Sequence, residues 1–265
     1  MALALTAGHA VLAAEPVQPP LMVYAAGSAT GVLGAMLKRY TAETGQQTAL
    51  QTGPAGLMRG KIERGAAVDL FVSANMEHPE QLRAEGKAGA TMVFARNRLC
   101  VSALHEVGLT RANMLSRLLD PKVRIGTSTP KADPGGDYAR LLFERADGVK
   151  PGATAILLAK AEQIVGGRIE AAPAKPINAR DGLIAHGVDV SIGYCSSRST
   201  VADTSVDKIE VPAALAVPVV YGMTVLTTSG DARREAAARR LARYLRSPEG
   251  QAMLAPYGFR RADGN

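Results

Sequence analysis

The chain has 265 residues, which is enough to bury a large core as one domain or as two lobes. Hydrophobic residues make up 47% and charged residues 21%, a composition typical of soluble globular proteins and not of disordered ones. Aromatic residues are scarce at 4% and tryptophan is absent, which argues against stacking platforms for bases or sugars. The net charge of +7 permits an acidic partner, but the basic residues are spread out and form no recognised motif, so we expect no nucleic-acid partner.

The N-terminal residues 1–14 are apolar and end in Leu12-Ala13-Ala14, ahead of a polar, proline-bearing stretch. This pattern is typical of the hydrophobic region and cleavage site of a secretory signal peptide, so we expect export with cleavage near Ala14. No Lys or Arg precedes the apolar run; either the true start lies further upstream or the interpretation as a signal is wrong. The run is too short to span a bilayer.

The stretch from Val23 to Leu33 predicts a strand, a turn of small residues and a helix that Ser28 caps. The strand is expected over residues 21–26, and the helix carries apolar residues at i, i+3, i+4 and i+7: Leu33, Met36, Leu37 and Tyr40. A helix start of this kind can hold an anion, because its free amides and its dipole both present positive charge. An ordinary strand-to-helix turn with a satisfied cap is the alternative.

Further strands and helices alternate along the rest of the chain. Strands are expected at residues 47–51, 69–74, 91–95, 99–103, 123–127, 188–195 and 217–227. Helices are expected from the Gly53–Gly56 turn to Gly65, and over residues 78–85, 153–164 and 232–245; one more carries Tyr138, Leu141, Leu142 and Arg145, and a short last one is capped by Ser247. This alternation predicts an α/β fold with largely parallel sheets, in which ligands gather at the carboxyl ends of strands.

Catalytic and metal-binding patterns are missing from the sequence. The four histidines are scattered without metal-ligand spacing, and there is no nucleophile elbow, P-loop or dinucleotide fingerprint. We therefore expect no catalytic residue, no free metal cation and no cofactor. Hydroxyl groups and glycines instead recur at strand ends, where they offer neutral donors and close backbone approach to a compact anion: Ser28, residues 53–56, 127–129, 135–136 and 194–197.

Several of these segments, in this order, resemble the periplasmic molybdate-binding proteins of ABC importers, which are type II solute-binding proteins. The resemblance rests on Ala25–Ser28, the Gly53–Gly56 turn, residues 67–74 and 134–139, Ile192-Gly193-Tyr194 and Tyr257-Gly258-Phe259, and it covers about residues 21–260. It implies two α/β lobes joined by a hinge, with an oxyanion held in the cleft between them. Lobe one would comprise residues 21–101 plus 221–265, and lobe two residues 102–220.

The resemblance also implies a set of ligand-binding residues. Matched position by position, the family's ligand-binding groups fall on Ser28, Ala55, Gly135, Ala179 and Tyr194. Ala55 departs from the family pattern, because a serine hydroxyl is replaced there by a methyl group and only the backbone N–H remains. Gly136, Lys131, Arg180 and Arg96 are accessory candidates near the cleft, and for the three basic residues a solvated surface or a structural ion pair is the alternative. For Asp69 we favour a structural hydrogen bond over a ligand role.

The two cysteines, Cys100 and Cys195, suggest a disulfide in an exported protein. Both lie on strands near the expected lobe boundary or cleft, where a bond could restrict hinge motion; two buried free thiols are the alternative. The arginines of the C-terminal helix predict a solvated face opposite Ala237, Leu241 and Leu245, with docking to an acidic transporter surface as a second interpretation.

Taken together, the resemblance implies a monomeric periplasmic protein that binds molybdate or tungstate and delivers it to an ABC importer permease. It would be no enzyme, and it would meet the membrane only through the permease. One alternative is the same fold with a different small anion, sulfate-like or an organic acid; a small-molecule enzyme is another.

Overall fold

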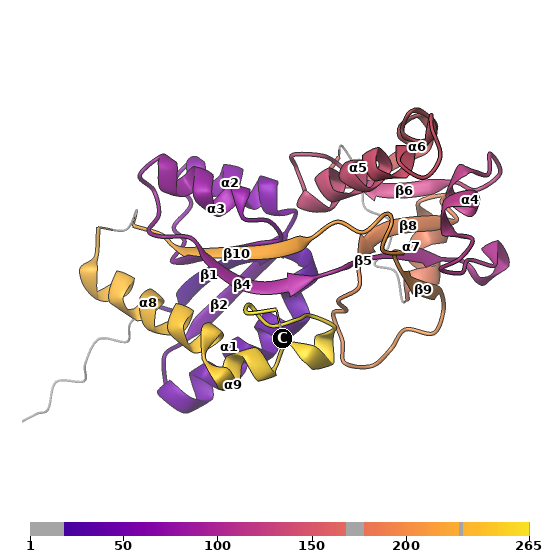
Figure 1. Ribbon diagram of the computed structural model, residues 1–265. Helices are drawn as coiled ribbons and strands as arrows, with labels where there is room; N and C mark the ends of the chain where they lie inside the picture. The colour runs from indigo at the N-terminus through magenta and orange to yellow at the C-terminus, as the bar shows by residue number, and fades with distance from the viewer. Residues whose placement is uncertain (1–18, 168–177, 228–229, 265) are drawn as a thin grey trace, which may run out of the picture.

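Two five-stranded sheets lie side by side in the part of the chain that the computed structural model describes, residues 19–167, 178–227 and 230–264 (Figure 1). The first sheet has the strand order β2-β1-β3-β10-β4, with bounds Thr48–Gly53, Leu21–Ala26, Leu70–Ser73, Val219–Val225 and Met92–Asn97. The second has the order β7-β6-β8-β5-β9, with bounds Ala161–Val165, Ile125–Ser128, Val190–Tyr194, Leu99–Ala103 and Asp207–Glu210. The expected signal segment, residues 1–14, lies outside the described residues.

Helices cover both sheets. Those of the first sheet are α1 (Thr30–Thr44), α2 (Ala55–Glu63), α3 (Glu77–Ala84), α8 (Ala232–Arg246) and α9 (Pro248–Ala252), with the 3₁₀ turns η1 (Gly27–Ala29) and η3 (Ala255–Tyr257). Those of the second are α4 (Met114–Leu119), α5 (Pro134–Asp147), α6 (Ala153–Lys160) and α7 (Ala179–Ala185), with η2 (His105–Val107). None of the helices in the described ranges has the length and hydropathy that a bilayer crossing requires.

Each sheet is half parallel and half antiparallel, so the expectation of largely parallel sheets is wrong. In the first sheet β1 runs parallel to β2 and β3, whereas β10 is antiparallel to β3 and β4. In the second, β6 is parallel to β7 and β8, whereas β5 is antiparallel to β8 and β9. The antiparallel pairs arise because β5 and β10 enter their sheets from the other half of the molecule.

The chain crosses between the sheets twice. The first crossing lies at Arg98, between β4 and β5, and the second over residues 211–218, between β9 and β10. The sheets therefore divide the chain slightly earlier than the lobe boundaries expected from the resemblance, which fall within β5 and β10. Below, lobe one means the first sheet with its helices and lobe two the second sheet with its helices.

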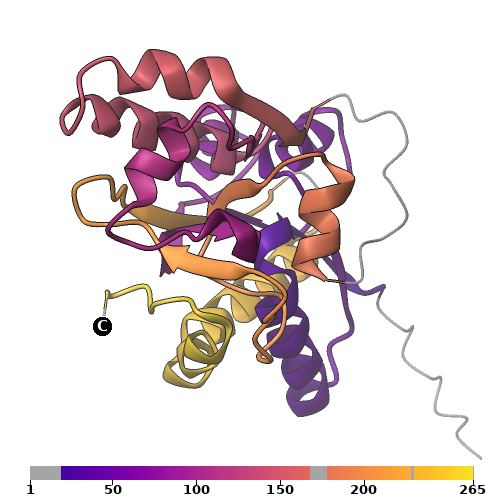
Figure 2. The same ribbon diagram turned by 90° about the vertical axis from the view of Figure 1, so that its right-hand side faces the viewer.

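The central strand and first helix of lobe one match the sequence prediction. β1 forms over the expected residues, and Leu33, Met36, Leu37 and Tyr40 of α1 are all buried. α1 lies beside α8 beneath the sheet (Figures 1 and 2), where the rings of Tyr40 and Tyr244 pack with their centroids 5.1 Å apart. Ser247 caps α9 as expected, since its side chain accepts a hydrogen bond from the Gly250 amide.

Lobe two departs from the sequence prediction in three respects. The helix expected over residues 153–164 ends at Lys160, and Ala161–Val165 is the edge strand β7. Its Ala, Glu and Gln residues favour a helix locally, but pairing with β6 overrides that propensity. In α5 the buried face is formed by Ala139, Leu142, Phe143 and Ala146, while Leu141 is exposed. The sequence patterns also did not predict α4, α7 or β9.

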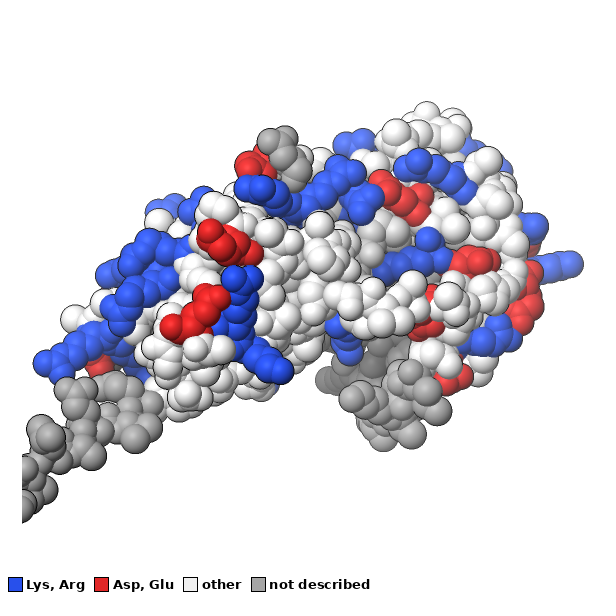
Figure 3. Space-filling model, turned by 90° about the horizontal axis from the view of Figure 1, so that it is seen from below, with Lys and Arg blue, Asp and Glu red and all other residues white. Residues whose placement is uncertain are grey.

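The outer face of α8 is basic (Figure 3). Ala237, Leu241 and Leu245 are buried against the sheet, as predicted, and the arginines lie on the other faces of the helix.

Two arginines of α8 form ion pairs: Arg239 with Glu235, one turn away, and Arg234 with the buried Asp69. Asp69 also accepts a hydrogen bond from the Met22 amide at 2.6 Å, so its predicted structural role is confirmed.

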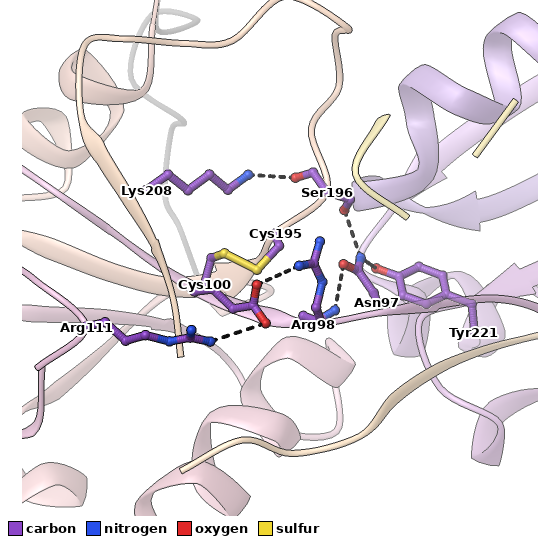
Figure 4. The surroundings of a disulfide bond; sticks show 9 residues. Asn97, Arg98, Cys100, Arg111, Cys195, Ser196, Lys208 and Tyr221 are labelled. Carbon is purple, nitrogen blue, oxygen red and sulfur yellow. Dashed lines mark hydrogen bonds and ion pairs between the residues drawn. A yellow bond between two sulfur atoms is a disulfide. The ribbon is translucent and has the colours of Figure 1, made fainter. Parts of the chain in front are cut away.

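Cys100 and Cys195 form a disulfide, which excludes the alternative of two free thiols (Figure 4). Cys100 lies on β5, and Cys195 follows β8, the neighbouring strand of the same sheet. The bond therefore joins neighbouring chain segments within lobe two. It does not connect the two lobes, which removes the basis for expecting it to restrict hinge motion directly.

Lobe one contains a histidine that the fold holds in its neutral form. His78 on α3 is buried, and its Nδ1 lies 3.2 Å from Arg59 Nη1. Burial, followed by the positive charge of Arg59, lowers the pKa of His78 from 6.5 to about 4. The unfolded chain therefore takes up this proton at a higher pH than the folded chain does.

Because protonation of His78 favours the unfolded chain, we expect the free energy of unfolding to fall as the pH decreases from 6.5 toward 4. The expected slope from this residue is about 1.4 kcal/mol per pH unit. Urea unfolding of the wild type and of His78→Gln between pH 7 and pH 5 measures it. The variant should lack this part of the pH dependence; equal slopes in the two proteins would contradict the assignment.

Candidate functional site

A cavity of about 300 Å3 lies between the lobes, at the carboxyl ends of several strands. Lobe one contributes the turn after β1 and the end of β2; lobe two contributes β6, the start of α5, and the ends of β7 and β8. The lining residues are Ala26, Gly27, Ser28, Gly53, Pro54, Gly126, Thr127, Ser128, Asp133, Gly135, Ile164, Val165, Ser191, Ile192, Gly193, Tyr194 and Arg198. We call this the interlobe cavity.

Ser28 lines the interlobe cavity, but it does not cap α1 as the sequence predicts. It lies within the 3₁₀ turn η1, and the N-cap of α1 is Ala29, without a side-chain hydrogen bond. The Ser28 hydroxyl shares a 2.7 Å hydrogen bond with Tyr221 Oη on β10. The extra turn moves the N-cap of the helix by one residue, from Ser28 to Ala29, and Tyr221 holds the Ser28 side chain at the cavity wall.

Tyr194, at the end of β8, brings a neutral phenol to the cavity. Its hydroxyl is buried and has no hydrogen-bond partner among the described residues. Tyr138 and Tyr221 pack edge-on against its ring, at centroid distances of 6.3 and 5.7 Å. Burial raises the pKa of Tyr194 well above its usual value, so the hydroxyl keeps its proton. A buried donor of this kind without an acceptor is rare in folded proteins.

Gly135 also lines the cavity, at the first turn of α5. Its amide, which the sequence predicts as a ligand donor, donates to Asp133 Oδ1 at 2.8 Å, since Asp133 is the N-cap of α5. Burial raises the pKa of Asp133, an effect that the Gly135 N–H partly opposes. Gly136 lies one residue further, and a Cβ there would lie 2.4 Å from the Ser128 carbonyl oxygen, so only glycine fits.

Ala55 lies next to the cavity wall but does not line the cavity. It is the first residue of α2 and is buried, while its neighbours Gly53 and Pro54 reach the cavity. The next two amides of α2 cross to lobe two: Gly56 N and Leu57 N donate to the Ala132 carbonyl at 3.0 and 3.3 Å. The start of α2 thus binds the loop ahead of α5.

Ala179 and Arg180 lie elsewhere in lobe two. The Ala179 amide donates to Asp203 at 2.7 Å, and Ala179 lines a separate cavity of about 520 Å3 beside the disulfide. The Arg180 guanidinium pairs with Glu106, which lowers the pKa of that carboxyl to about 2. These two residues, at the start of α7, therefore do not line the interlobe cavity with Ser28, Gly135 and Tyr194.

Neither Lys131 nor Arg96 lines the interlobe cavity. Lys131 has a positive φ of 66°, and its amide donates to Asp137. Arg96 donates through Nε to the Ala262 carbonyl at 3.1 Å, which ties the C-terminal segment to β4. For Arg180 the structure thus shows a structural ion pair, which is the alternative named from the sequence.

Two charged residues of the cavity, Asp133 and Arg198, were not among the predicted ligand-binding residues. Arg198 follows β8 and is exposed at the cavity mouth; a Cβ on Gly27 would lie 3.8 Å from its Nη2. No hydrogen bond or ion pair joins its guanidinium to any residue that the structure describes. Asp133 stands before Pro134-Gly135-Gly136, a helix-start signal that could have placed it at the site, whereas no local pattern marks Arg198.

No cluster of three or more histidine, cysteine or carboxylate side chains able to hold a metal ion occurs in the described ranges. The interlobe cavity instead presents hydroxyl groups from both lobes, including Ser28, Thr127, Ser128 and Tyr194, together with one carboxylate and one guanidinium. Such a set can bind a small polar anion by hydrogen bonds.

A comparison with known protein families finds one family model that matches most of the chain. Residues 21–260 match the family model for "Bacterial extracellular solute-binding protein". The chain belongs to this family. The uncharacterized protein PM1146 of Pasteurella multocida is 36% identical to it over 185 residues, which cover 68% of this chain and 76% of that protein.

Solved structures share the two-lobed fold. The periplasmic molybdate-binding protein of Azotobacter vinelandii superposes with a TM-score of 0.69 at 20% identity, covering 90% of this chain and 98% of that one. The sulfate-binding protein SubI of Mycobacterium tuberculosis superposes with a TM-score of 0.72 at 17% identity, covering 93% and 88%. The expected type II solute-binding fold is thus confirmed, as is the broader recognition of a solute-binding protein.

Gly56 is the residue on which close approach of the lobes depends. A Cβ at this position would lie 2.0 Å from the Lys131 carbonyl oxygen and 2.8 Å from that of Ala132. We therefore expect Gly56→Ala to prevent the lobes from closing fully, which should increase the radius of gyration in X-ray scattering and weaken ligand binding.

Gly34→Ala is the matched control, because a Cβ on Gly34 in α1 meets no atom within 4 Å. Both variants place alanine in a helix, which favours helix formation, so the helical circular dichroism should be retained in both. A Gly56→Ala protein that closes and binds like Gly34→Ala would contradict the role given to Gly56.

Proposed function

We propose that this protein captures a small solute bearing an oxyanion group in the interlobe cavity and delivers it, in the periplasm, to the permease of an ABC importer. The observation that carries the proposal is the buried Tyr194 hydroxyl, which has no partner among the described residues and belongs to a residue that lines a cavity shared with Ser28 of the other lobe. Membership of the solute-binding family supports the transport role.

The mechanism follows from the groups that line the cavity. Donors from both lobes surround the anion and replace the water that it loses, which offsets the cost of desolvation. Arg198 at the mouth supplies a charge-assisted donor, the stronger kind of hydrogen bond to an oxyanion. Because the donors come from both lobes, the ligand favours the closed arrangement, and closure presents the permease with a defined surface.

Molybdate and tungstate are the first candidate ligands, and the sequence resemblance is what supports them. The alternative is another small anion, such as an organic acid or its phosphate. Three observations support the alternative: Ala55 lacks the hydroxyl of the family pattern, Asp133 brings a carboxylate to the wall, and the cavity has a volume of about 300 Å3. On the same measure one water needs only about 10–15 Å3, so the cavity has room for more than a bare tetrahedral oxyanion.

We infer binding and no catalysis. Asp133 and Arg198 are the ionised side chains among the described residues that line the cavity, and they form no ion pair with each other. The hydroxyls that line the cavity have no neighbouring histidine that could act as a base.

Thermal unfolding against molybdate, tungstate, sulfate, phosphate and a set of small organic acids tests the proposal. An anion present at about a hundred times its dissociation constant stabilises the folded protein by about 2.7 kcal/mol, which raises the midpoint by roughly 5–10 °C. We expect such a shift with at least one anion. No shift with any of them, together with a shift for a neutral sugar or a cation, would contradict anion capture.

Removal of the Tyr194 hydroxyl should separate binding from stability. Because this hydroxyl has no partner among the described residues, we expect Tyr194→Phe to unfold at an unchanged or slightly higher temperature without ligand. A lost hydrogen bond to an anion should weaken binding by about tenfold or more. Tyr244→Phe is the control, since Tyr244 has the same kind of buried hydroxyl but lies on α8, away from the cavity. Equal affinities in the two variants would contradict the role of Tyr194.

A further inference from the structure

The interlobe cavity has no net formal charge. Asp133 and Arg198 are its ionised lining residues in the described part of the chain, and their charges cancel. Neither side chain forms an ion pair with a residue that the structure describes, so the Arg198 guanidinium and one oxygen of Asp133 remain open to a ligand. A cavity built for a fully ionised dianion would gain nothing from a carboxylate in its wall, because like charges repel strongly where water is excluded.

Asp133 is held in place by the fold and is not a mobile surface group. Its Oδ1 accepts the Gly135 amide at 2.8 Å as the N-cap of α5, a helix of 14 residues, and this leaves Oδ2 without a hydrogen-bond partner among the described residues. The positive φ of Gly166 lets the chain after β7 approach closely, and a Cβ there would lie 3.7 Å from Asp133 Cβ and from Pro54 Cβ. The carboxylate therefore lies where the two lobes meet.

The groups that face Asp133 make its negative charge costly. Asp137, on the same helix, repels the Asp133 carboxylate. The charge of Asp133 in turn contributes to the raised pKa of two buried phenols, Tyr194 on β8 and Tyr221 on β10. Burial is the main cause of the raised pKa of Asp133. Arg198, the cation of the cavity, is too far away to form an ion pair with it. The buried Tyr194 hydroxyl is a second polar group that has no partner in the same cavity.

We propose that the interlobe cavity binds its anion together with one proton, shared between Asp133 Oδ2 and a ligand oxygen, and thereby selects a phosphoryl group over sulfate and molybdate. Arg198, Ser28 and Tyr194 donate to the remaining oxygens. This inference rests on the proposed function and names the class of anion that the same site takes.

Phosphoryl groups meet this requirement because they keep a proton near neutral pH. A phosphate monoester takes up its second proton with a pKa of about 6, so a modest interaction with Asp133 retains that proton at neutral pH. Sulfate and molybdate carry none under these conditions, and each would place an unshared negative charge against the carboxylate. The cavity volume of about 300 Å3 leaves room for a small organic group on the phosphate.

Titration calorimetry with inorganic phosphate, glycerol 3-phosphate, sulfate and molybdate tests the proposal in the wild type and in Asp133→Asn. Asparagine is as good an N-cap as aspartate, so the variant should keep α5 intact. Asp231→Asn is the matched control, because Asp231 caps α8 in the same manner, away from the cavity. Each titration is run at pH 8 in two buffers of different ionisation enthalpy, which gives the number of protons taken up on binding.

In the wild type and in Asp231→Asn, we expect at least one of the two phosphate probes to bind at least tenfold more tightly than sulfate and molybdate, with uptake of close to one proton at pH 8. A preference for glycerol 3-phosphate over inorganic phosphate would show that the bound phosphoryl group belongs to a phosphate ester and not to free phosphate. In Asp133→Asn the proton uptake should disappear, phosphate binding should weaken at least tenfold, and sulfate or molybdate should bind more tightly.

Two results would overturn the inference while leaving anion capture intact: tight binding of sulfate or molybdate by the wild type without proton uptake, or an unchanged preference in Asp133→Asn. If the wild type binds none of the four anions and no organic acid, but binds a neutral sugar, the proposed function fails as well.

Discussion

The two lobes of this protein meet at one backbone carbonyl beside the interlobe cavity. Ala132, in the loop ahead of α5, accepts hydrogen bonds from the amides of Gly56 and Leu57 at the start of α2 in the other lobe. The contact needs a glycine at 56, because any Cβ would overlap the Lys131 carbonyl. It also needs Lys131 in the left-handed region, which costs a non-glycine residue about 1 kcal/mol and is supported here by Asp137, whose carboxylate accepts the Lys131 amide. A helix start that could have held an anion instead holds the opposite lobe.

Because the first amides of α2 donate to Ala132, a ligand in the interlobe cavity must be bound mainly by side chains. Gly56 and Leu57, which follow Ala55, are engaged by Ala132. The Gly135 amide is engaged by Asp133 and the Ala179 amide by Asp203, so two of the backbone donors expected from the resemblance already have acceptors. What remains open to a ligand is a set of side chains: Tyr194, Ser28, Arg198 and the second oxygen of Asp133. Side-chain donors and a carboxylate can discriminate among anions by protonation state, which backbone amides alone cannot do.

The sequence predicted those parts of the fold that depend on local pattern. The apolar spacing in α1, the strand Leu21–Ala26 and the cap at Ser247 follow from residues within one or two turns of each other, and the structure has them as expected. The strand β7 could not be predicted in this way, because its residues favour a helix and only pairing with β6 makes them a strand. Ser28, Gly135 and Tyr194 were found because strand ends carry hydroxyl groups and glycines, and the two sheets bring these three to one cavity.

Arg198 and Asp133 show where sequence reasoning reaches its limit. Arg198 reaches the cavity because the segment after β8 packs against α1 of the other lobe, where the absence of a Cβ on Gly31 leaves space for the Arg198 carbonyl. That contact joins residues far apart in the chain and has no local signature. Asp133 does have a signature, but it indicates a helix cap, and a cap is satisfied by one carboxylate oxygen. The role of the other oxygen depends on the cavity between the lobes, which Tyr194 also lines; the buried Tyr194 hydroxyl has no hydrogen-bond partner among the described residues. The same residue thus caps α5 and contributes the carboxylate of the cavity. If it shares a proton with the ligand as proposed, an Asp-to-Asn exchange would change specificity while the cap, and with it the fold, is kept.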